Sequence, residues 1–396
     1  MSYIQIKLKP KEEDRLLAGH PWVYANEIEK VPVHLTQGSL VEVVTSKAHF
    51  VGRGVANPSS KILARLLTHS TQEEVGEGLI AARARRALQL RKGMGEKYST
   101  DSLRLIFGEA DGLPGVIVDS FGEGAVLSCF SAGMKPFIPV LVKTLLENGI
   151  RFIYEKSVGE TCVKEGMPQS EGWLTEAGSF PLEIKEGGAH FRIWPDKGHK
   201  TGFYLDFREA RTRLRDLSRG KRVLDAFCYT GASAIQAALG GAAQITAVES
   251  SQEALEQAAE NARLNGVEKT IQFEKNDTFK ALREFKKEGR SYDGIVLDPP
   301  PLAKSVHDLP NARNALQRLA SQALDLLTPG GFLITATCSH HFPWTILEGV
   351  VREAVENSGR SFRLVERLTQ PTDHPIVLSI PETEYLRALV LQEISG

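Results

Sequence analysis

The stretch VLDAFCYTGASA (223–234) contains the local pattern that decides the fold. It begins with a short apolar run of the kind that forms a buried strand, and Gly231 then marks a turn before an alanine-rich helix start. The same order of strand and helix recurs downstream, where the further apolar runs are QITAVES (244–250), TIQFEKND (270–277), DGIVLDPP (293–300) and GFLITATC (331–338). Strands that alternate with helices indicate a parallel sheet with crossover helices, so the C-terminal half is predicted to be an α/β domain.

The N-terminal half has a different organisation. Short alternating segments such as SLVEVVTS (39–46), broken by Gly, Pro and Asn, predict a small β-rich domain. A helical pattern over residues 73–94 then opens a region in which strand and helix patterns are mixed. We therefore predict three domains, a β-rich domain at 1–72, a mixed α+β domain at 73–192 and the α/β domain at 193–396.

Composition and charge exclude several classes of protein. Hydrophobic residues make up 42% of the 396 residues and charged residues 24%, which is typical of a folded, soluble chain. No run approaches the roughly 18 apolar residues of a membrane span, and MSYIQIKLKPKEED (1–14) is too charged for a secretory signal. We therefore expect a cytoplasmic protein without a membrane partner.

A net charge of -1 argues against indiscriminate binding of polyanions, but it averages over the domains. The helical segment AARARRALQLRK (81–92) is a candidate basic face. A solvated helix surface is the more common origin of such a cluster, so both interpretations stay open.

Acidic residues follow three successive strands of the predicted α/β sheet. Asp225 can accept a hydrogen bond from a cationic or amino group, Glu249 can bridge two ribose hydroxyls, and Asp277 can accept from an exocyclic amino group. Each alone is more often a cap or turn residue. Because ligands of parallel sheets bind at the carboxyl ends of the strands, the three together predict a pocket for a nucleoside joined to an amino acid. The segment lacks G-x-G-x-x-G, which disfavours a dinucleotide.

Several motifs carry a family resemblance. DAFCYTG (225–231), AVESS (247–251), KNDTF (275–279) and LDPP (297–300) resemble the class I S-adenosylmethionine-dependent methyltransferases. Outside them, GHKTGFYLDFREAR (198–211), GHPWVYANEI (19–28), GEADGLPGVIVD (108–119), TCSHH (337–341) and DHP (373–375) resemble the large-subunit ribosomal RNA 5-methylcytosine methyltransferases that carry an N-terminal PUA domain. The resemblance covers nearly the whole chain.

This resemblance implies a Rossmann-like class I methyltransferase domain with an N-terminal β-rich PUA domain for RNA and a middle α+β domain. It also implies S-adenosyl-L-methionine as the cofactor and 23S ribosomal RNA as the partner. The expected cofactor-binding residues are Asp225, Tyr229, Gly231, Glu249, Asn276, Asp277 and Asp298. One position departs from the family, since Phe207 stands where relatives often have glutamine, so no cofactor contact is assigned to it.

The segment LDPPPLAKS (297–305) predicts a stiff loop after the fourth strand. Methyltransferases that act on amino groups of purines share a D-P-P motif and usually have an aromatic residue next to it. Here Pro301 follows instead, which disfavours amino-group methylation without excluding it. Asp298 is expected to hydrogen-bond N3 or N4 of a cytosine.

The cysteines are Cys129, Cys162, Cys228 and Cys338, and no two of them form a C-x-x-C pair. This spacing argues against disulfides and against a structural zinc site. Cys338 lies at a ligand-binding strand end within the family-like TCS, which favours a catalytic thiolate over a buried, inert cysteine. Zinc binding by Cys338 and His340 has too few ligands, so no metal is expected.

The sequence leaves several alternatives open. The base that removes the carbon 5 hydrogen of cytosine is His340, a water molecule or Asp298. Amino-group methylation of an RNA purine and a non-catalytic RNA-binding assembly factor remain competing functions, and a homodimer is one alternative for the oligomeric state.

Overall fold

The protein is described by a computed structural model that covers residues 2–176, 178–303 and 305–394. The chain forms two compact units. Unit 1 comprises Met1–Leu182, Trp194–Gly202 and Asp373–Thr383, and unit 2 comprises Glu183–Ile193, Phe203–Thr372 and Glu384–Gly396. The chain therefore enters each unit repeatedly, and the division into three domains remains a proposal.

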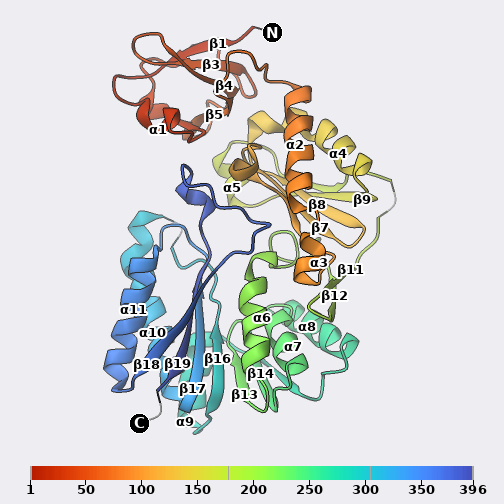
Figure 1. Ribbon diagram of the computed structural model, residues 1–396, viewed down its shortest axis with the longest axis vertical. Coiled ribbons are helices and arrows are strands. Elements are labelled where there is room, and N and C mark those ends of the chain that lie inside the picture. The colour runs from red at the N-terminus through yellow and green to blue at the C-terminus, as the bar shows by residue number, and fades with distance from the viewer. Residues whose placement is uncertain (1, 177, 304, 395–396) are drawn as a thin grey trace. The chain divides into compact units, whose positions relative to one another are not determined.

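Unit 1 contains two sheets (Figure 1). The first has the strand order β1–β3–β4–β5–β2, in which β1 and β3 are parallel and the other pairs antiparallel. Its strands are β1 (Ile4–Lys7), β2 (Trp22–Tyr24), β3 (Leu40–Val44), β4 (Phe50–Ala56) and β5 (Ile62–Thr68). The short helix α1 (Asp14–Leu17) lies between β1 and β2 in the chain. This agrees with the β-rich region expected from the alternating sequence pattern.

The second sheet of unit 1 has the order β10–β9–β8–β7–β6. Its strands are β6 (Arg104–Phe107), β7 (Val116–Phe121), β8 (Gly124–Cys129), β9 (Phe152–Ser157) and β10 (Ser170–Trp173), and the helices are α2 (Glu77–Arg91), α3 (Met94–Tyr98), α4 (Ile138–Glu147) and α5 (Glu160–Lys164). The apolar faces of α2 and α4 pack on this sheet in one buried core. The helix expected over 73–94 ends earlier, because Gly93 adopts a left-handed conformation with φ of 81°.

Segment 373–383 contributes to unit 1 although it follows most of unit 2 in the chain. The Arg91 guanidinium donates to the carbonyl of Asp373 at 2.8 Å, and the backbone N–H of Arg104 donates to the Asp373 carboxylate at 3.0 Å. Nε2 of His20 lies 3.1 Å from a carboxylate oxygen of Glu382. These contacts fix both ends of the segment on residues that precede it by hundreds of positions.

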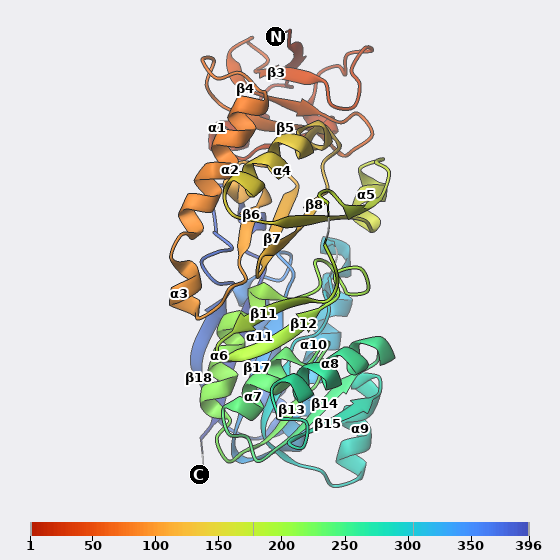
Figure 2. The same cartoon turned by 90° about the vertical axis from the view of Figure 1, so that its right-hand side faces the viewer.

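Unit 2 is built on a sheet with the order β15–β14–β13–β16–β17–β19–β18 (Figures 1 and 2). The pairs from β15 to β17 are parallel, and β19 is antiparallel to both β17 and β18. The strands are β13 (Arg222–Asp225), β14 (Gln244–Glu249), β15 (Ile271–Lys275), β16 (Tyr292–Leu297), β17 (Leu327–Thr337), β18 (Phe362–Thr369) and β19 (Arg387–Glu393). The sequence analysis identified β13 to β17 and did not identify β18 or β19.

Helices cover both faces of this sheet. Figure 1 shows α10 (Leu309–Leu326) and α11 (Trp344–Ser358) on one side, and α6 (Arg208–Leu217) and α7 (Ala232–Leu239) on the other. The remaining helices of unit 2 are α8 (Gln252–Leu264) and α9 (Thr278–Lys287). Leu316, Leu347 and Leu282 pack on the buried strand residues Leu297 and Leu333. Within the described ranges, the helices are too short or too polar to cross a bilayer.

A buried ion cluster joins α6 to the hairpin of β11 (Leu182–Glu186) and β12 (Ala189–Ile193). The Glu186 carboxylate accepts from Nε of Arg208 at 3.0 Å and from Nε of Arg211 at 2.7 Å. Burial alone would raise the pKa of Glu186, but the guanidinium groups of Arg211 and Arg208 outweigh burial and lower this pKa. Glu186 is therefore ionised and its charge is balanced inside the protein.

We expect Glu186→Ala to lower the free energy of unfolding by about 3–5 kcal/mol, because it leaves two buried guanidinium groups without their carboxylate. Glu183 is the matched control, since it lies on the same strand and pairs with Arg192 at 2.9 Å while its side chain is 65% exposed. Glu183→Ala should cost at most about 1 kcal/mol. Urea denaturation of both variants measures the difference, and equal losses would contradict a structural role for the cluster.

Candidate active site

The predicted site residues lie at one edge of the unit 2 sheet. Asp225 ends β13, Glu249 ends β14, and Asn276 and Asp277 follow β15. The parallel register pairs Asp225 with Ala247 on one side and with Val296 on the other, so these strands end together. Asp298 and Cys338 follow β16 and β17 at the same edge.

The loop between β13 and α7 has an unusual backbone. Tyr229 has φ of 47° and Gly231 has φ of 84°, so both adopt the left-handed conformation. A Cβ atom at Gly231 would lie 3.1 Å from Cβ of Ala258, which leaves little room for a side chain. The backbone N–H of Tyr229 donates to the Glu249 carboxylate at 3.2 Å. The strained loop is therefore held against the end of the neighbouring strand.

Asp225 has an uncompensated buried oxygen. The residue is 1% exposed, and among the described residues its Oδ2 has no hydrogen-bond partner. Burial raises the pKa of Asp225 to about 7, although backbone hydrogen bonds from Ala234 and Phe227 act in the opposite direction. A buried acceptor without a donor is costly, so this oxygen suits a ligand that brings a cationic or N–H group.

Glu249 is fixed by the backbone around it. One carboxylate oxygen accepts from the N–H groups of Ser250 at 2.7 Å and Ser251 at 2.8 Å, and the other accepts from Tyr229. These bonds orient the carboxylate without neutralising its charge. Its remaining lone pairs can accept hydrogen bonds from ligand hydroxyls.

The residues after β15 also have structural roles. Asp277 is exposed and caps α9, with its side chain accepting from the N–H of Lys280 at 3.0 Å. The Asn276 side chain donates to Glu284 at 2.8 Å, and its backbone N–H donates to the carbonyl of Glu249 at 3.1 Å. Helix capping thus explains Asp277 without a ligand, while a cofactor contact through it remains a proposal.

Cys338 lies against the D-P-P loop. Leu297 is in register with Thr335, so the loops that follow β16 and β17 leave the sheet side by side. Sγ of Cys338 is 3.9 Å from the carbonyl oxygen of Pro299, which directly follows Asp298. The Ser339 hydroxyl donates to the carbonyl of Ala303 at 2.8 Å. The thiol and the Asp298 segment are therefore neighbours, as the family resemblance implies.

Arg387 supports this loop from β19. Its guanidinium donates to the carbonyl of Phe342 at 3.3 Å and to the Glu384 carboxylate at 2.9 Å, and it is 5% exposed. The strand ends at Thr337, so His340 and His341 lie in a loop, where their ring centroids are 3.8 Å apart. Among the described residues, no group of three His, Cys, Asp or Glu side chains could hold a metal ion.

The other cysteines are in a different environment. Cys129, Cys162 and Cys228 are buried, whereas Cys338 is partly exposed. Burial raises the pKa of Cys129 to about 11 and raises that of Cys228 well above its usual value. The thiols of Cys129 and Cys228 therefore stay protonated at neutral pH, and the partial exposure of Cys338 distinguishes it from them.

Tyr204 is a site residue that the sequence analysis missed. Its ring centroid lies 5.2 Å from that of Tyr229. Burial, followed by the charges of Tyr229, Asp206, Asp298 and Cys338, raises the pKa of Tyr204 well above its usual value. The hydroxyl of Tyr204 therefore stays protonated at neutral pH. Tyr204 belongs to the quoted segment 198–211, but nothing in that segment alone shows which side chain faces the site.

Comparisons with known proteins agree with this geometry. Residues 6–69 match a PUA-like domain, and residues 163–391 match the S-adenosylmethionine-dependent methyltransferases. Over 390 residues the chain is 37% identical to the ribosomal RNA large subunit methyltransferase I of Shewanella amazonensis, with 98% of both chains covered. The chain belongs to this family of S-adenosylmethionine-dependent methyltransferases. The protein of the same name from Cronobacter sakazakii is 34% identical, with 97% of this chain and 98% of that one covered.

Solved structures show the same fold. A Streptococcus mutans protein assigned as a SAM-dependent methyltransferase matches with a TM-score of 0.85 at 19% identity, covering 98% of this chain and 100% of that one. A second protein assigned as a methyltransferase, crystallised with SAH, matches with a TM-score of 0.83 at 19% identity, covering 99% and 100%. The predicted fold class and the predicted cofactor, S-adenosyl-L-methionine, are confirmed.

The residues at the sheet edge fit this cofactor. The unpaired oxygen of Asp225 suits an ammonium group, and the oriented carboxylate of Glu249 suits ribose hydroxyls. At Gly231 a ligand can approach the backbone closely because no side chain is present. Phe207 is 3% exposed and so has little surface left for a ligand contact.

We expect Asp225→Asn to change the pH dependence of stability. The pKa of Asp225 in the folded protein, about 7, lies above the ordinary value of 3.8. The folded protein thus binds this proton more tightly than the unfolded chain, and the associated stability is present below about pH 4 and lost as the pH rises through about 7. The asparagine variant lacks this loss, so its free energy of unfolding should rise relative to wild type by on the order of 1–3 kcal/mol between about pH 5 and pH 8.

Urea denaturation without cofactor at these two pH values measures the change. In calorimetry, the same variant should bind S-adenosylmethionine roughly 10–100-fold more weakly, because the ligand loses a buried acceptor. If wild type and Asp225→Asn show the same change in the free energy of unfolding with pH, and the same affinity for S-adenosylmethionine, the assigned role of Asp225 is contradicted.

Proposed function

We propose that the protein methylates carbon 5 of a cytosine in large-subunit (23S) ribosomal RNA through a covalent adduct of Cys338. The observation that carries this proposal is the partly exposed thiol beside the Asp298 segment, at the sheet edge that also holds Asp225 and Glu249. The names of the relatives from Shewanella and Cronobacter support ribosomal RNA as the substrate, and the PUA-like domain supports an RNA partner. A cytoplasmic location follows from this substrate.

The Cys338 thiolate is needed to activate carbon 5 of the cytosine. Carbon 5 of cytosine is a weak nucleophile, but addition of the Cys338 thiolate to carbon 6 moves the π electrons of the 5,6 bond toward carbon 5. Asp298 hydrogen-bonds N3 or N4 of the cytosine, and in its protonated form it donates to N3 and so stabilises the negative charge that develops as the adduct forms. When bound, S-adenosylmethionine would supply the methyl group as an electrophile, with its methyl–sulfur bond breaking and S-adenosylhomocysteine as the leaving group.

The reaction then restores the aromatic ring of the cytosine and the thiolate of Cys338. Once carbon 5 carries the methyl group, a base removes the hydrogen from carbon 5, the electron pair re-forms the 5,6 double bond, and the bond from carbon 6 to sulfur breaks. Tyr204 lies within electrostatic reach of this chemistry with a protonated hydroxyl, so it can donate a hydrogen bond but cannot act as the base.

Different residues at the carboxyl edge of the unit 2 sheet contact different parts of the cofactor. We propose that Asp225 and Gly231 contact the methionine part, that Glu249 holds the ribose, and that Asn276 and Asp277 contact the adenine. Tyr229 and Asp298 complete the pocket, with Asp298 between the cofactor and the base. Amino-group methylation is disfavoured because Pro301, rather than an aromatic ring, follows the D-P-P motif.

We expect RNA made with 5-fluorocytidine to trap the enzyme. Fluorine at carbon 5 cannot leave as a proton, so the methylated adduct keeps its bond to Cys338 and migrates as a band that survives denaturing electrophoresis. Cys338→Ala should lose this band and should lower turnover by about 10³-fold or more, as expected for removal of a covalent nucleophile.

Cys162→Ala is the control, because Cys162 is a buried cysteine of unit 1 and its loss should leave the band intact. Mass spectrometry of nucleosides from treated RNA identifies the product. Formation of 5-methylcytidine by the Cys338→Ala protein would refute the covalent mechanism. A methylated purine from wild type would establish the amino-group alternative.

A further inference from the structure

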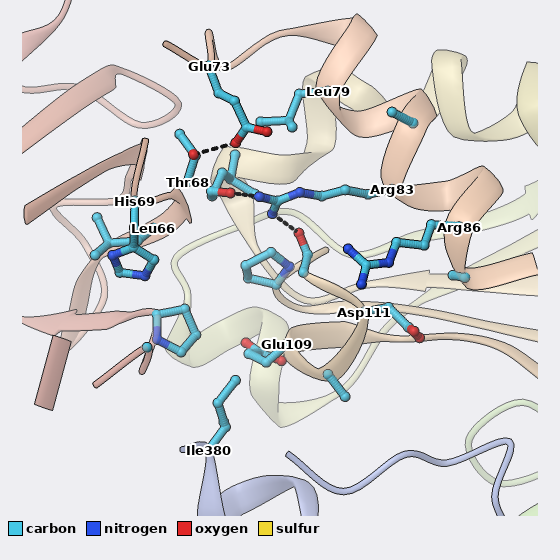
Figure 3. A pocket seen from close by; sticks show the side chains of 18 of the residues that line it. Leu66, Thr68, His69, Glu73, Leu79, Arg83, Arg86, Glu109, Asp111 and Ile380 are labelled. Carbon is cyan, nitrogen blue, oxygen red and sulfur yellow. Dashed lines mark hydrogen bonds between the residues drawn. The ribbon is translucent and has the colours of Figure 1, made fainter. Parts of the chain in front are cut away.

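A cavity of about 740 Å³ lies in unit 1 between β5, helix α2 and the turn at 109–114 (Figure 3). Its apolar lining includes Pro21, Leu66, Leu79, Leu90, Pro114 and Ile380. This volume is in the range of small-molecule sites and is sufficient for a nucleotide. None of its lining residues belongs to the sheet edge described above.

The two walls of the cavity are joined by hydrogen bonds. The Arg83 guanidinium donates to the carbonyl of Leu67 on β5 and, at 2.6 Å, to the carbonyl of Gly112. Nε1 of Trp22 donates to the Glu109 carboxylate at 2.8 Å. The cavity is therefore formed before any ligand arrives, which lowers the entropic cost of binding.

The basic segment 81–92 supplies the charge. Arg91 pairs with Asp111 at 2.7 Å and Arg85 pairs with Glu147 at 3.5 Å. Arg86 is exposed and points into the cavity (Figure 3), and within the described part of the chain no ion pair joins it to a carboxylate. The segment thus combines structural cations with one that is available to a ligand.

The acidic groups of the cavity already have donors. Glu73 accepts from the Thr68 hydroxyl (Figure 3). Glu109 accepts from Trp22, and Asp111 is held by Arg91. Burial lowers the pKa of Arg83, the carboxylate of Glu73 acts in the opposite direction, and the charge of Arg86 has a smaller lowering effect. The Arg83 and Arg86 side chains both line the cavity (Figure 3), so its wall carries positive charge that attracts an anion.

His69 offers a directional contact. Its Nδ1 lies 2.9 Å from the carbonyl oxygen of Val51, so this nitrogen carries the hydrogen. In the neutral ring Nε2 is then an acceptor that can bond an amino or imino group. Apolar walls, a free guanidinium and an acceptor suit a ligand that is planar, anionic and rich in N–H groups.

We propose that this cavity binds one unpaired nucleotide of the substrate RNA, with its base between the apolar side chains, its phosphate on Arg86 and its base edge at His69. The inference rests on the proposed RNA substrate and goes beyond it, because it assigns an RNA contact to residues outside the reaction site. A single unstacked base buried in a protein pocket is a common mode of RNA recognition.

The test measures binding of the full-length protein to an unmodified large-subunit ribosomal RNA transcript at several salt concentrations. Arg86→Ala should weaken binding about five- to tenfold and should reduce the slope of log affinity against log salt by about one, the effect of one lost phosphate contact. Arg85→Ala removes the neighbouring arginine, whose partner is Glu147, and should bind RNA like wild type. Affinity for S-adenosylmethionine should be unchanged in both.

A second variant distinguishes the contribution of the cavity to RNA binding from that of the Arg86 charge. Ala82 lines the cavity and is exposed, so Ala82→Trp fills the space without altering any charge. It should weaken RNA binding at least about fivefold while leaving the salt slope unchanged.

The outcomes distinguish this inference from the proposed function. Wild-type protein that neither binds nor methylates the transcript refutes the proposed function. If both Arg86→Ala and Ala82→Trp bind RNA normally, the inference that the cavity binds a nucleotide is refuted while the proposed function stands. A loss confined to Arg86→Ala also refutes it, because it would indicate a phosphate contact on the surface. A loss seen with protein-containing ribosomal particles but not with the naked transcript would identify a protein partner and also refute the inference.

Discussion

The ionised carboxylate of Glu186 is the constraint on which the active-site side of unit 2 depends. It binds Arg208 and Arg211 in the interior, and its own carbonyl accepts from the side chain of Gln236 on α7 at 2.7 Å. Arg211 uses another N–H to bind the carbonyl of Tyr204 at 2.8 Å. Glu186 therefore links the β11–β12 hairpin to helices α6 and α7 and, through Arg211, to the segment that carries Tyr204. The Tyr204 ring in turn lies edge-on against Tyr229 in the loop between β13 and α7.

The sheet edge separates two kinds of chemistry. The strands β13 to β15 present carboxylates, which suit hydroxyl and ammonium groups, while the loops after β16 and β17 present Asp298 and a thiol. Parallel register brings both sets to one edge without any long-range sequence signal. Cys338 at this edge is partly exposed, whereas the other three cysteines are buried.

Much of this edge could be predicted from the sequence because buried parallel strands are continuous apolar runs, and each ends at a polar residue. β18 was missed because all eight of its residues are exposed or half-buried and three are charged, so FRLVERLT carries no clear period. β19 follows an irregular segment that belongs to unit 1, and its pairing with β17 has no local signature. Tyr204 was missed for a similar reason, since its role depends on an ion cluster whose members are distant in the chain.

The basic segment 81–92 shows a different limit of prediction from the sequence. Its spacing suggested either a solvated face or a binding face, and the structure shows that each arginine has its own environment. Arg91 is buried and Arg83 half-buried, and both bond to backbone or carboxylate oxygens, whereas Arg85 and Arg86 are exposed. Charge spacing on a helix cannot distinguish these cases, because the partners come from other elements.

The position of segment 373–383 determines when unit 1 can be completed during synthesis. Arg91 and the backbone of Arg104 bind Asp373, which emerges from the ribosome 282 and 269 residues after them. Domains usually fold in the order in which they are made, but here the first unit lacks a buried part until almost the whole chain has been translated. Unit 1 therefore cannot form its contacts with this segment until residues 373–383 have been translated.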